Sequence, residues 1–146
     1  MLVKEQFTLD DLIGIPFINE GRSLDGCDCW GLVRLAFSTY GIIVPDYKIS
    51  CYASMKIAKQ IQKEKEKTWK ELPSKGSDIE QIPAPTLVVM MLGDSNKIIC
   101  NHHGIYIGKG KILHTSKDSV NGSYIVRLDE PSIKDRIDGF YKYSPK

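Results

Sequence analysis

The spacing of hydrophobic residues changes near the middle of the chain. In the first half, apolar residues recur every three or four positions, most clearly over 29–40, as in a helix with one buried face. In the second half they form short runs separated by Gly, Asn and Asp, beginning with a nearly continuous apolar run over 86–92. A helical half followed by a strand-rich half predicts the α+β fold class, with helices packed on an antiparallel sheet.

Three helical segments are predicted in the first half. Thr8 and Asp11 form a helix-start capping pattern for a short first helix that ends at Gly14. The clearest helix begins after Asp28, its N-cap, and ends at Gly41, while the residues before Asp28 read as an irregular loop. A third helical stretch runs from about residue 50 to 72, and the KEKEK run within it predicts a solvated face.

The second half is predicted to form a sheet of about five strands. A connection over 73–85 that contains three prolines separates these strands from the helices. The alternation and turn residues place the strands at 86–92, 98–107, 111–116, 124–128 and 140–143. The second and third of these strands are joined by a glycine-rich turn and should form a hairpin.

The length of the hairpin turn decides which histidines share a face of the sheet. A three-residue loop over 108–110 pairs Gly104 with His114 and places His114 on the same face as His102. His103 then points to the opposite face, because successive side chains alternate along a strand. A two-residue loop would instead place His114 beside His103. The assignment therefore depends on the turn.

Length and composition fit one globular domain that spans 1–146. With 42% hydrophobic and 26% charged residues, the chain is not a disordered tail, a fibrous repeat or a disulfide scaffold. The formal net charge of +2 is too small to indicate nucleic-acid binding. No stretch approaches the roughly 18–20 apolar residues of a membrane span, and the first residues lack a signal-peptide pattern. We therefore expect no membrane insertion, synthesis in the cytoplasm and reduced cysteines.

A cysteine at a helix start, with histidines on later strands, indicates a thiol nucleophile and an imidazole base. Cys29 stands at the first turn of the clearest helix. Unpaired backbone N–H groups and the helix dipole stabilise a thiolate at that position. A nearby imidazole can take the thiol proton and later give it to a leaving amine.

The cysteines allow two other interpretations. A zinc site built from Cys27, Cys29, Cys100, His102 and His103 is disfavoured, because structural zinc sites use C-x2-4-C pairs and this chain has C-x-C. A disulfide within that C-x-C segment under oxidising conditions would silence Cys29. We expect no metal and no cofactor, and inert thiols at Cys51 and Cys100.

Two sharp motifs resemble a known family. DCWGLV at 28–33 and HHGIYIG at 102–108, followed by KILH at 111–114, are similar to the motifs of the NlpC family of papain-like cell-wall peptidases. The resemblance extends over about 13–143 and implies a papain-like, NlpC-type domain. It also implies a cysteine peptidase that cuts the γ-D-glutamyl to diamino-acid bond of peptidoglycan stem peptides. In that peptidase Cys29 is the nucleophile, and His114 orients the base, His102.

Tryptophan after the nucleophile resembles the variants that phages and prophages encode as tail-associated components. The short domain and the missing signal-peptide pattern agree with that variant. It implies phage tail proteins as partners, and a virion-associated location from which the enzyme acts on the cell wall. Peptidoglycan, rather than nucleic acid, is then the substrate.

Some positions depart from the family pattern. Phe17 stands where the family usually has a tyrosine whose hydroxyl lines the oxyanion site, and Glu20 where a glycine is common. The resemblance places Asp28 and Trp30 beside Phe17 around the oxyanion and substrate, with Asp28 as a helix cap and Trp30 mainly in packing. His103 occupies a position that is normally apolar, and we expect a core or rim residue.

Because the loss of one oxyanion donor costs on the order of 100-fold in rate, Phe17 leaves an alternative open. The chain would then be a weakly active or inactive structural component of a phage tail that keeps the peptidase fold. A hydrolase of another amide or a thioester is a third possibility, because a fold does not fix a substrate.

Overall fold

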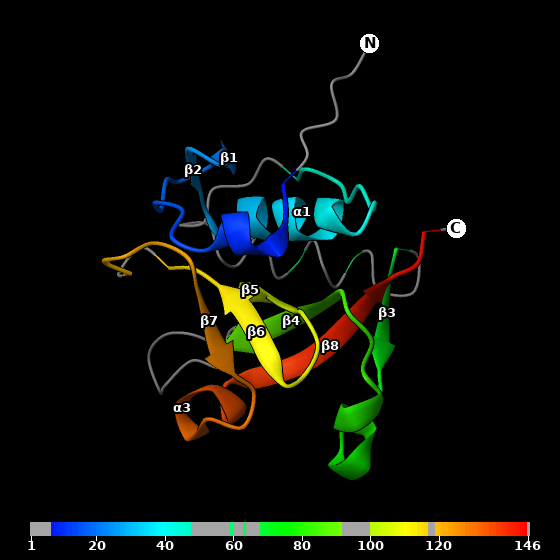
Figure 1. Cartoon of the computed structure of the whole chain (residues 1–146). Coiled ribbons are helices and arrows are strands. Elements are labelled where there is room, and N and C mark those ends of the chain that lie inside the picture. The colour runs from blue at the N-terminus through cyan, green and yellow to red at the C-terminus, as the bar shows by residue number, and fades with distance from the viewer. Residues whose placement is uncertain are drawn as a thin grey trace.

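One helix lies across an antiparallel sheet in the computed structural model, which describes residues 7–47, 59, 63, 68–91, 100–116 and 119–145. Helix α1 (Cys29–Thr39) covers one face of the sheet, and the short helices η2 (Gly76–Gln81) and α3 (Pro131–Lys134) lie on the other side (Figure 1). Across the sheet the strands are β3 (Trp69–Leu72), β8 (Ile137–Tyr143), β4 (Thr86–Met91), β5 (Cys100–Tyr106), β6 (Lys111–His114) and β7 (Tyr124–Arg127). The predicted α+β class is therefore confirmed.

The ends of the first two helices follow their capping residues. The Asp28 carboxylate accepts a hydrogen bond from the Gly31 backbone N–H at 2.8 Å, which satisfies one unpaired donor of the first turn of α1. The chain leaves α1 at Gly41, whose φ of +79° is the left-handed conformation that stops a helix. The predicted first helix is the 3-10 helix η1 (Leu9–Leu12), where the Thr8 backbone N–H donates to Asp11 at 2.9 Å.

Side chains on the two faces of the sheet form separate hydrophobic clusters. The helix-side core joins α1 to the sheet and includes Leu12, Trp30, Val33, Phe37, Trp69, Val89, Ile105 and Leu113. The far-side core packs under η2 and α3 and includes Val88, Met90, Tyr106, Ile112, Leu128 and Phe140. Burial on both faces explains why 86–91 reads as a continuous apolar run rather than an alternating one.

The sheet has six strands where the sequence predicted about five. Trp69–Leu72 was predicted to end the third helix but forms strand β3, which pairs with β8 from Trp69↔Tyr143 to Leu72↔Phe140. Trp69 is fully buried and packs edge-on against Phe37, so tertiary packing overrides the helical pattern of the preceding segment. Residues 59 and 63 are helical, and the rest of the predicted stretch over 50–67, with the KEKEK run and Cys51, lies outside the described residues.

Further short elements lie outside the predicted helices and strands. The segment before α1 contains the two-stranded sheet of β1 (Arg22–Ser23) and β2 (Gly26–Cys27). The proline-containing connection contains η2, and α3 starts at a proline, a residue favoured at the first helical position. Among the described residues no helix is long and apolar enough to cross a membrane.

Candidate active site

The hairpin of β5 and β6 has the predicted three-residue loop. Tyr106 pairs with Ile112, and the Ile107 N–H donates to the carbonyl of Lys111 at 3.0 Å. All three loop residues have positive φ, namely Gly108 (+90°), Lys109 (+53°) and Gly110 (+73°). This register puts His102 and His114 on one face and His103 on the other, which confirms the predicted alternation.

His102 and His114 contact each other through their rings. His102 Nε2 lies 3.1 Å from His114 Nδ1, and the rings meet edge-to-face at a centroid distance of 5.4 Å. Burial, together with the charges of His114 and His103, holds the pKa of His102 well below 6.5. Burial also lowers the pKa of His114 to about 4. Both rings are therefore neutral at neutral pH, and one must donate to the other.

The direction of that hydrogen bond decides which nitrogen of His102 is basic. If His102 donates its Nε2–H to His114 Nδ1, the other ring nitrogen of His102, Nδ1, carries a lone pair and can accept a proton. If His114 donates instead, His102 Nδ1 carries the hydrogen and cannot act as a base. A base at His102 thus requires His114 to be the acceptor.

Cys29 is the first residue of α1 and is buried, with 4% of its surface exposed. Neither Cys29 nor its neighbour Cys27 is in a disulfide in this structure. Burial raises the pKa of Cys27 to about 12, and the charge of Asp28 acts in the same direction. Cys27 is therefore an inert thiol. A thiolate at Cys29, by contrast, would face the backbone N–H groups of the helix start.

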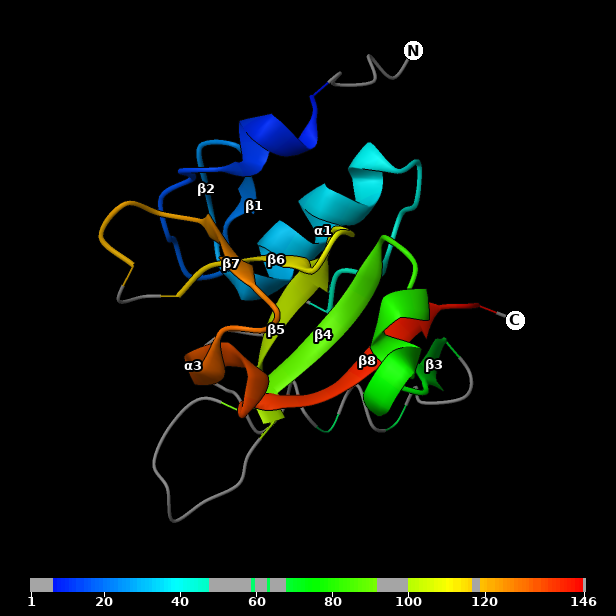
Figure 2. The ribbon, with the colours of Figure 1, turned by 60° about the horizontal axis from the view of Figure 1, so that its bottom comes forward.

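The first turn of α1 packs against the start of β5. The indole ring of Trp30 meets the imidazole of His103 edge-on, with 5.5 Å between the ring centroids. Cys29 precedes Trp30 and His102 precedes His103 in the chain, so the backbones of both candidate catalytic residues adjoin this contact. Figure 2 shows the helix above the sheet, with its first turn on the side of β6 and β7.

Strand β5 is irregular beside His102. The register with β4 shifts from Met90↔His102 to Met91↔Cys100, so two residues of β5 oppose one of β4 at this point. Such a bulge bends a strand and changes the direction of the adjacent side chains. The side chain that would approach the helix start therefore belongs to a locally distorted part of the strand.

His103 is a core residue, as predicted. Its side chain is fully buried, and neither ring nitrogen has a hydrogen-bond partner among the described residues. Burial lowers its pKa to about 4, so the ring is neutral at physiological pH. An imidazole with both nitrogens unpaired in a core is costly, which fits the apolar residue that the family pattern usually has there.

Trp30 packs in the interior rather than lining an open surface. It is 2% exposed, its Nε1–H donates to the carbonyl of Pro45 at 2.9 Å, and its ring lies 5.0 Å from that of Tyr47. Phe17 is half-buried and forms a parallel bridge with Cys27, two residues before Cys29. Phe17 is thus close in space to the helix start, but it offers no hydroxyl donor there.

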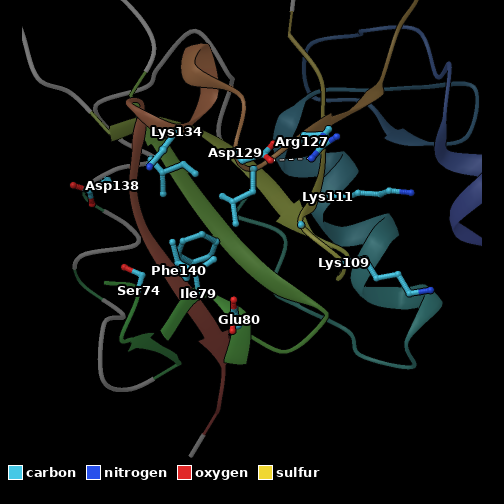
Figure 3. A pocket seen from close by; sticks show the side chains of 13 residues that line it. Ser74, Ile79, Glu80, Lys109, Lys111, Arg127, Asp129, Lys134, Asp138 and Phe140 are labelled. Atoms are coloured by element: carbon cyan, nitrogen blue, oxygen red, sulfur yellow. Dashed lines mark hydrogen bonds and ion pairs between the residues drawn. The ribbon is translucent and has the colours of Figure 1, made fainter. Parts of the chain in front are cut away.

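A cavity of about 780 Å³ opens on the far face of the sheet, away from α1 (Figure 3). Leu128 and Phe140 of the far-side core form part of its floor, and charged residues such as Arg127 and Lys134 stand around it. Neither Cys29 nor any histidine lines this cavity. It is therefore separate from the candidate catalytic residues.

The fold and the motif residues together define the class of protein. A helix with a cysteine at its first position packs on an antiparallel sheet that carries a histidine pair, as in α+β domains of the papain-like, NlpC type. The model of the NlpC/P60 family matches residues 14–141, and the chain belongs to this family. The resemblance of the sequence motifs to the NlpC family is thereby confirmed.

Solved structures of the family share the fold. A protein described as similar to a lipoprotein of the NLP/P60 family, from Staphylococcus aureus subsp. aureus Mu50, is similar with a TM-score of 0.61 and 17% identity, over 94% of this chain and 40% of that chain. An NlpC/P60 family protein from Bacillus cereus ATCC 10987 has a TM-score of 0.60 and 20% identity, over 95% of this chain and 41% of that chain. The NlpC/p60 domain of the peptidoglycan hydrolase SagA has a TM-score of 0.53 and 16% identity, over 91% of both chains.

These similarities establish the fold. The chain spans about two-fifths of the length of the Staphylococcus and Bacillus chains, which extend beyond the shared domain. No curated protein matches the chain.

Proposed function

We propose that this protein is a cysteine peptidase that hydrolyses the γ-D-glutamyl to diamino-acid bond of peptidoglycan stem peptides. The observation that carries the proposal is the His102–His114 pair at 3.1 Å, on the strand that packs against the helix begun by Cys29. Family membership supports it, and so does the structural similarity to a domain of a peptidoglycan hydrolase. The specific bond is carried over from the motif resemblance.

In this mechanism His102 Nδ1 accepts the Cys29 thiol proton while Sγ attacks the carbonyl carbon of the scissile amide. The resulting oxyanion faces the backbone N–H groups of the helix start. When the C–N bond breaks, the imidazolium gives its proton to the leaving amine and a thioester remains on Cys29. Water, deprotonated by His102, then hydrolyses the thioester and restores the thiol. His114 accepts the Nε2–H of His102 throughout.

The second candidate function is a structural component of a phage tail that keeps the fold with little activity. Phe17 favours it, because the tyrosine hydroxyl of the family pattern is missing from the helix start. For the active enzyme as well, we propose a tail-associated location, with synthesis in the cytoplasm and tail proteins as partners. This part rests on the likeness of the DCWGLV segment to phage and prophage variants.

Digestion of purified peptidoglycan, followed by mass analysis of the soluble fragments, tests the proposal. Fragments that end at γ-D-glutamate, absent with a Cys29→Ser variant, are expected. No release by the folded protein would support the structural role, while cleavage at another amide would keep the peptidase chemistry and overturn the substrate.

A further inference from the structure

A buried ion pair lies directly beside the start of α1. Arg22 Nη1 donates to Asp28 Oδ1 at 2.7 Å, and the side chain of Asp28 is only 1% exposed. Arg22 itself is 17% exposed, and its Nη1 also donates to the carbonyl of Gly21 at 2.9 Å. No sequence pattern marks Arg22, because it lies in a segment that reads as an irregular loop.

Both oxygens of Asp28 are occupied by donors. Besides Arg22, the backbone N–H of Gly31 donates to Oδ1 at 2.8 Å and that of Glu20 donates to Oδ2 at 2.8 Å. Glu20 has a φ of +64°, a conformation that favours the glycine expected at this position. Asp28 therefore holds together the loop before α1 and the first turn of the helix.

The carboxylate of Asp28 is unfavourable for a thiolate next to it. Cys29 follows Asp28 in the chain, and two like charges in a buried site disfavour each other. Cys27, on the other side of Asp28, already shows the effect. Burial and, to a smaller extent, the charge of Asp28 raise the pKa of Cys27 to about 12, whereas the charge of Arg22 acts to lower it. A cation on Asp28 removes this penalty.

Arg22 also ties the segments before and after the helix together. Its Nε donates to Asp46 Oδ1 at 3.1 Å, and Asp46 is joined to Arg34 of α1 at 3.6 Å. A planar guanidinium can contact two carboxylates at fixed angles, which a lysine ammonium does less well. The arginine is thus suited both to neutralise Asp28 and to fix its orientation.

We propose that Arg22 is a positioning residue that keeps the Cys29 thiol reactive by neutralising and orienting Asp28 at the start of α1. This inference rests on the proposed role of Cys29 as the nucleophile. It assigns Arg22 no contact with the substrate.

The test is the pH dependence of Cys29 alkylation by iodoacetamide, in a protein whose Cys27, Cys51 and Cys100 are replaced by serine. Arg22→Gln is expected to raise the apparent thiol pKa by about one unit, which is about a tenfold slower reaction at pH 7. Adding Asp28→Asn removes the uncompensated charge and should restore at least half of that shift. Arg127→Gln, which breaks the exposed Arg127–Asp129 pair, is the matched control and should leave the profile unchanged.

A second variant separates charge from geometry. Arg22→Lys keeps the cation and should react within about threefold of the parent at pH 7, with a lower melting temperature because one carboxylate contact is lost. If Arg22→Gln does not fold by circular dichroism, this variant carries the test, and a tenfold loss of reactivity in it would contradict the proposal. A folded Arg22→Gln with an unchanged alkylation profile would also overturn it.

Because iodoacetamide reports on the thiol itself, this result is independent of peptidoglycan cleavage. A protein that shows the Arg22 effect but releases no fragments would keep the inference and remove the proposed function. Fragment release without the Arg22 effect would keep the proposed function and remove the inference about Arg22.

Discussion

His102 Nε2 and His114 Nδ1 lie 3.1 Å apart, so His102 Nδ1 is free to accept a proton only when His114 accepts this hydrogen bond. In the proposed mechanism His114 therefore sets the tautomer and orientation of His102. His114→Ala is therefore expected to lower kcat/KM on a synthetic stem peptide by about 100-fold or more. His114→Asn, whose amide oxygen can still accept the Nε2–H, should recover part of that loss.

Circular dichroism serves as the control for these two variants, since both must remain folded. The role assigned to His114 would be wrong if the alanine variant kept more than about one third of the parent activity.

The unpaired ring of His103 predicts a loss of stability in acid. Burial lowers its pKa to about 4, against 6.5 in the unfolded chain, so the unfolded state binds more protons between these values. The contribution of the neutral ring to the free energy of unfolding is fully present above pH 6.5 and is lost as the pH falls toward 4. For one such histidine this amounts to about 2 kcal/mol between pH 7 and pH 5.

His103→Val, which replaces the ring with an apolar side chain, should therefore reduce the acid sensitivity. Urea unfolding at pH 7 and pH 5 measures this acid sensitivity. The decrease in unfolding free energy from pH 7 to pH 5 should be about 2 kcal/mol smaller in the variant than in the parent. His102 and His114, whose pKa values are also lowered by burial, keep the remaining acid sensitivity. An equal decrease in both proteins would show that His103 is not buried as a neutral ring.

Restoring a hydroxyl at residue 17 should increase activity. Phe17 bridges to Cys27 beside the helix start, where the family pattern has a tyrosine. Since one oxyanion donor is worth on the order of 100-fold, Phe17→Tyr is expected to raise kcat by about tenfold or more. Phe17→Leu, without a hydroxyl, should give no gain. Equal rates for the tyrosine variant and the parent would remove residue 17 from the oxyanion site.

The glycine of the DCWGLV segment is required by a close contact between the loop and the helix. A Cβ at residue 31 would lie 2.1 Å from the carbonyl oxygen of Gly21 and 3.0 Å from Cys27 Cβ. Although alanine normally stabilises a helix relative to glycine, Gly31→Ala should lower the unfolding free energy by about 2–3 kcal/mol. Ser38→Ala near the end of α1 is the control, with an expected change within about 0.5 kcal/mol. A stable Gly31→Ala variant would contradict the tight packing.

Local signals in the sequence predicted the helix of Cys29, and they predicted the histidine pair for a three-residue hairpin loop. Asp28 and Gly41 fix the ends of α1, and the two glycines around Lys109 allow the three positive φ values that set the hairpin register. From that register the pairing of His102 with His114 follows by alternation alone. These features depend on residues that are close in the sequence.

Features that depend on distant partners were not predictable in the same way. Trp69 belongs to strand β3 only because β8, far along the chain, pairs with it. Arg22 also contacts Asp46, which follows the helix in the chain. The ring of Tyr124, on a neighbouring strand, lies 4.4 Å from that of His114. No periodicity or capping signal marks such contacts, because they form only when the tertiary structure does.

The pH dependence of Cys29 alkylation, with and without His102→Ala, tests the central claim most directly. Cys27, Cys51 and Cys100 are replaced by serine in both proteins, so that one thiol reports. We predict that Cys29 reacts well below the ordinary cysteine pKa of about 8.5 and loses this reactivity with His102→Ala. Ordinary alkylation in both proteins would contradict the pairing of thiol and imidazole and would favour the structural role in a phage tail.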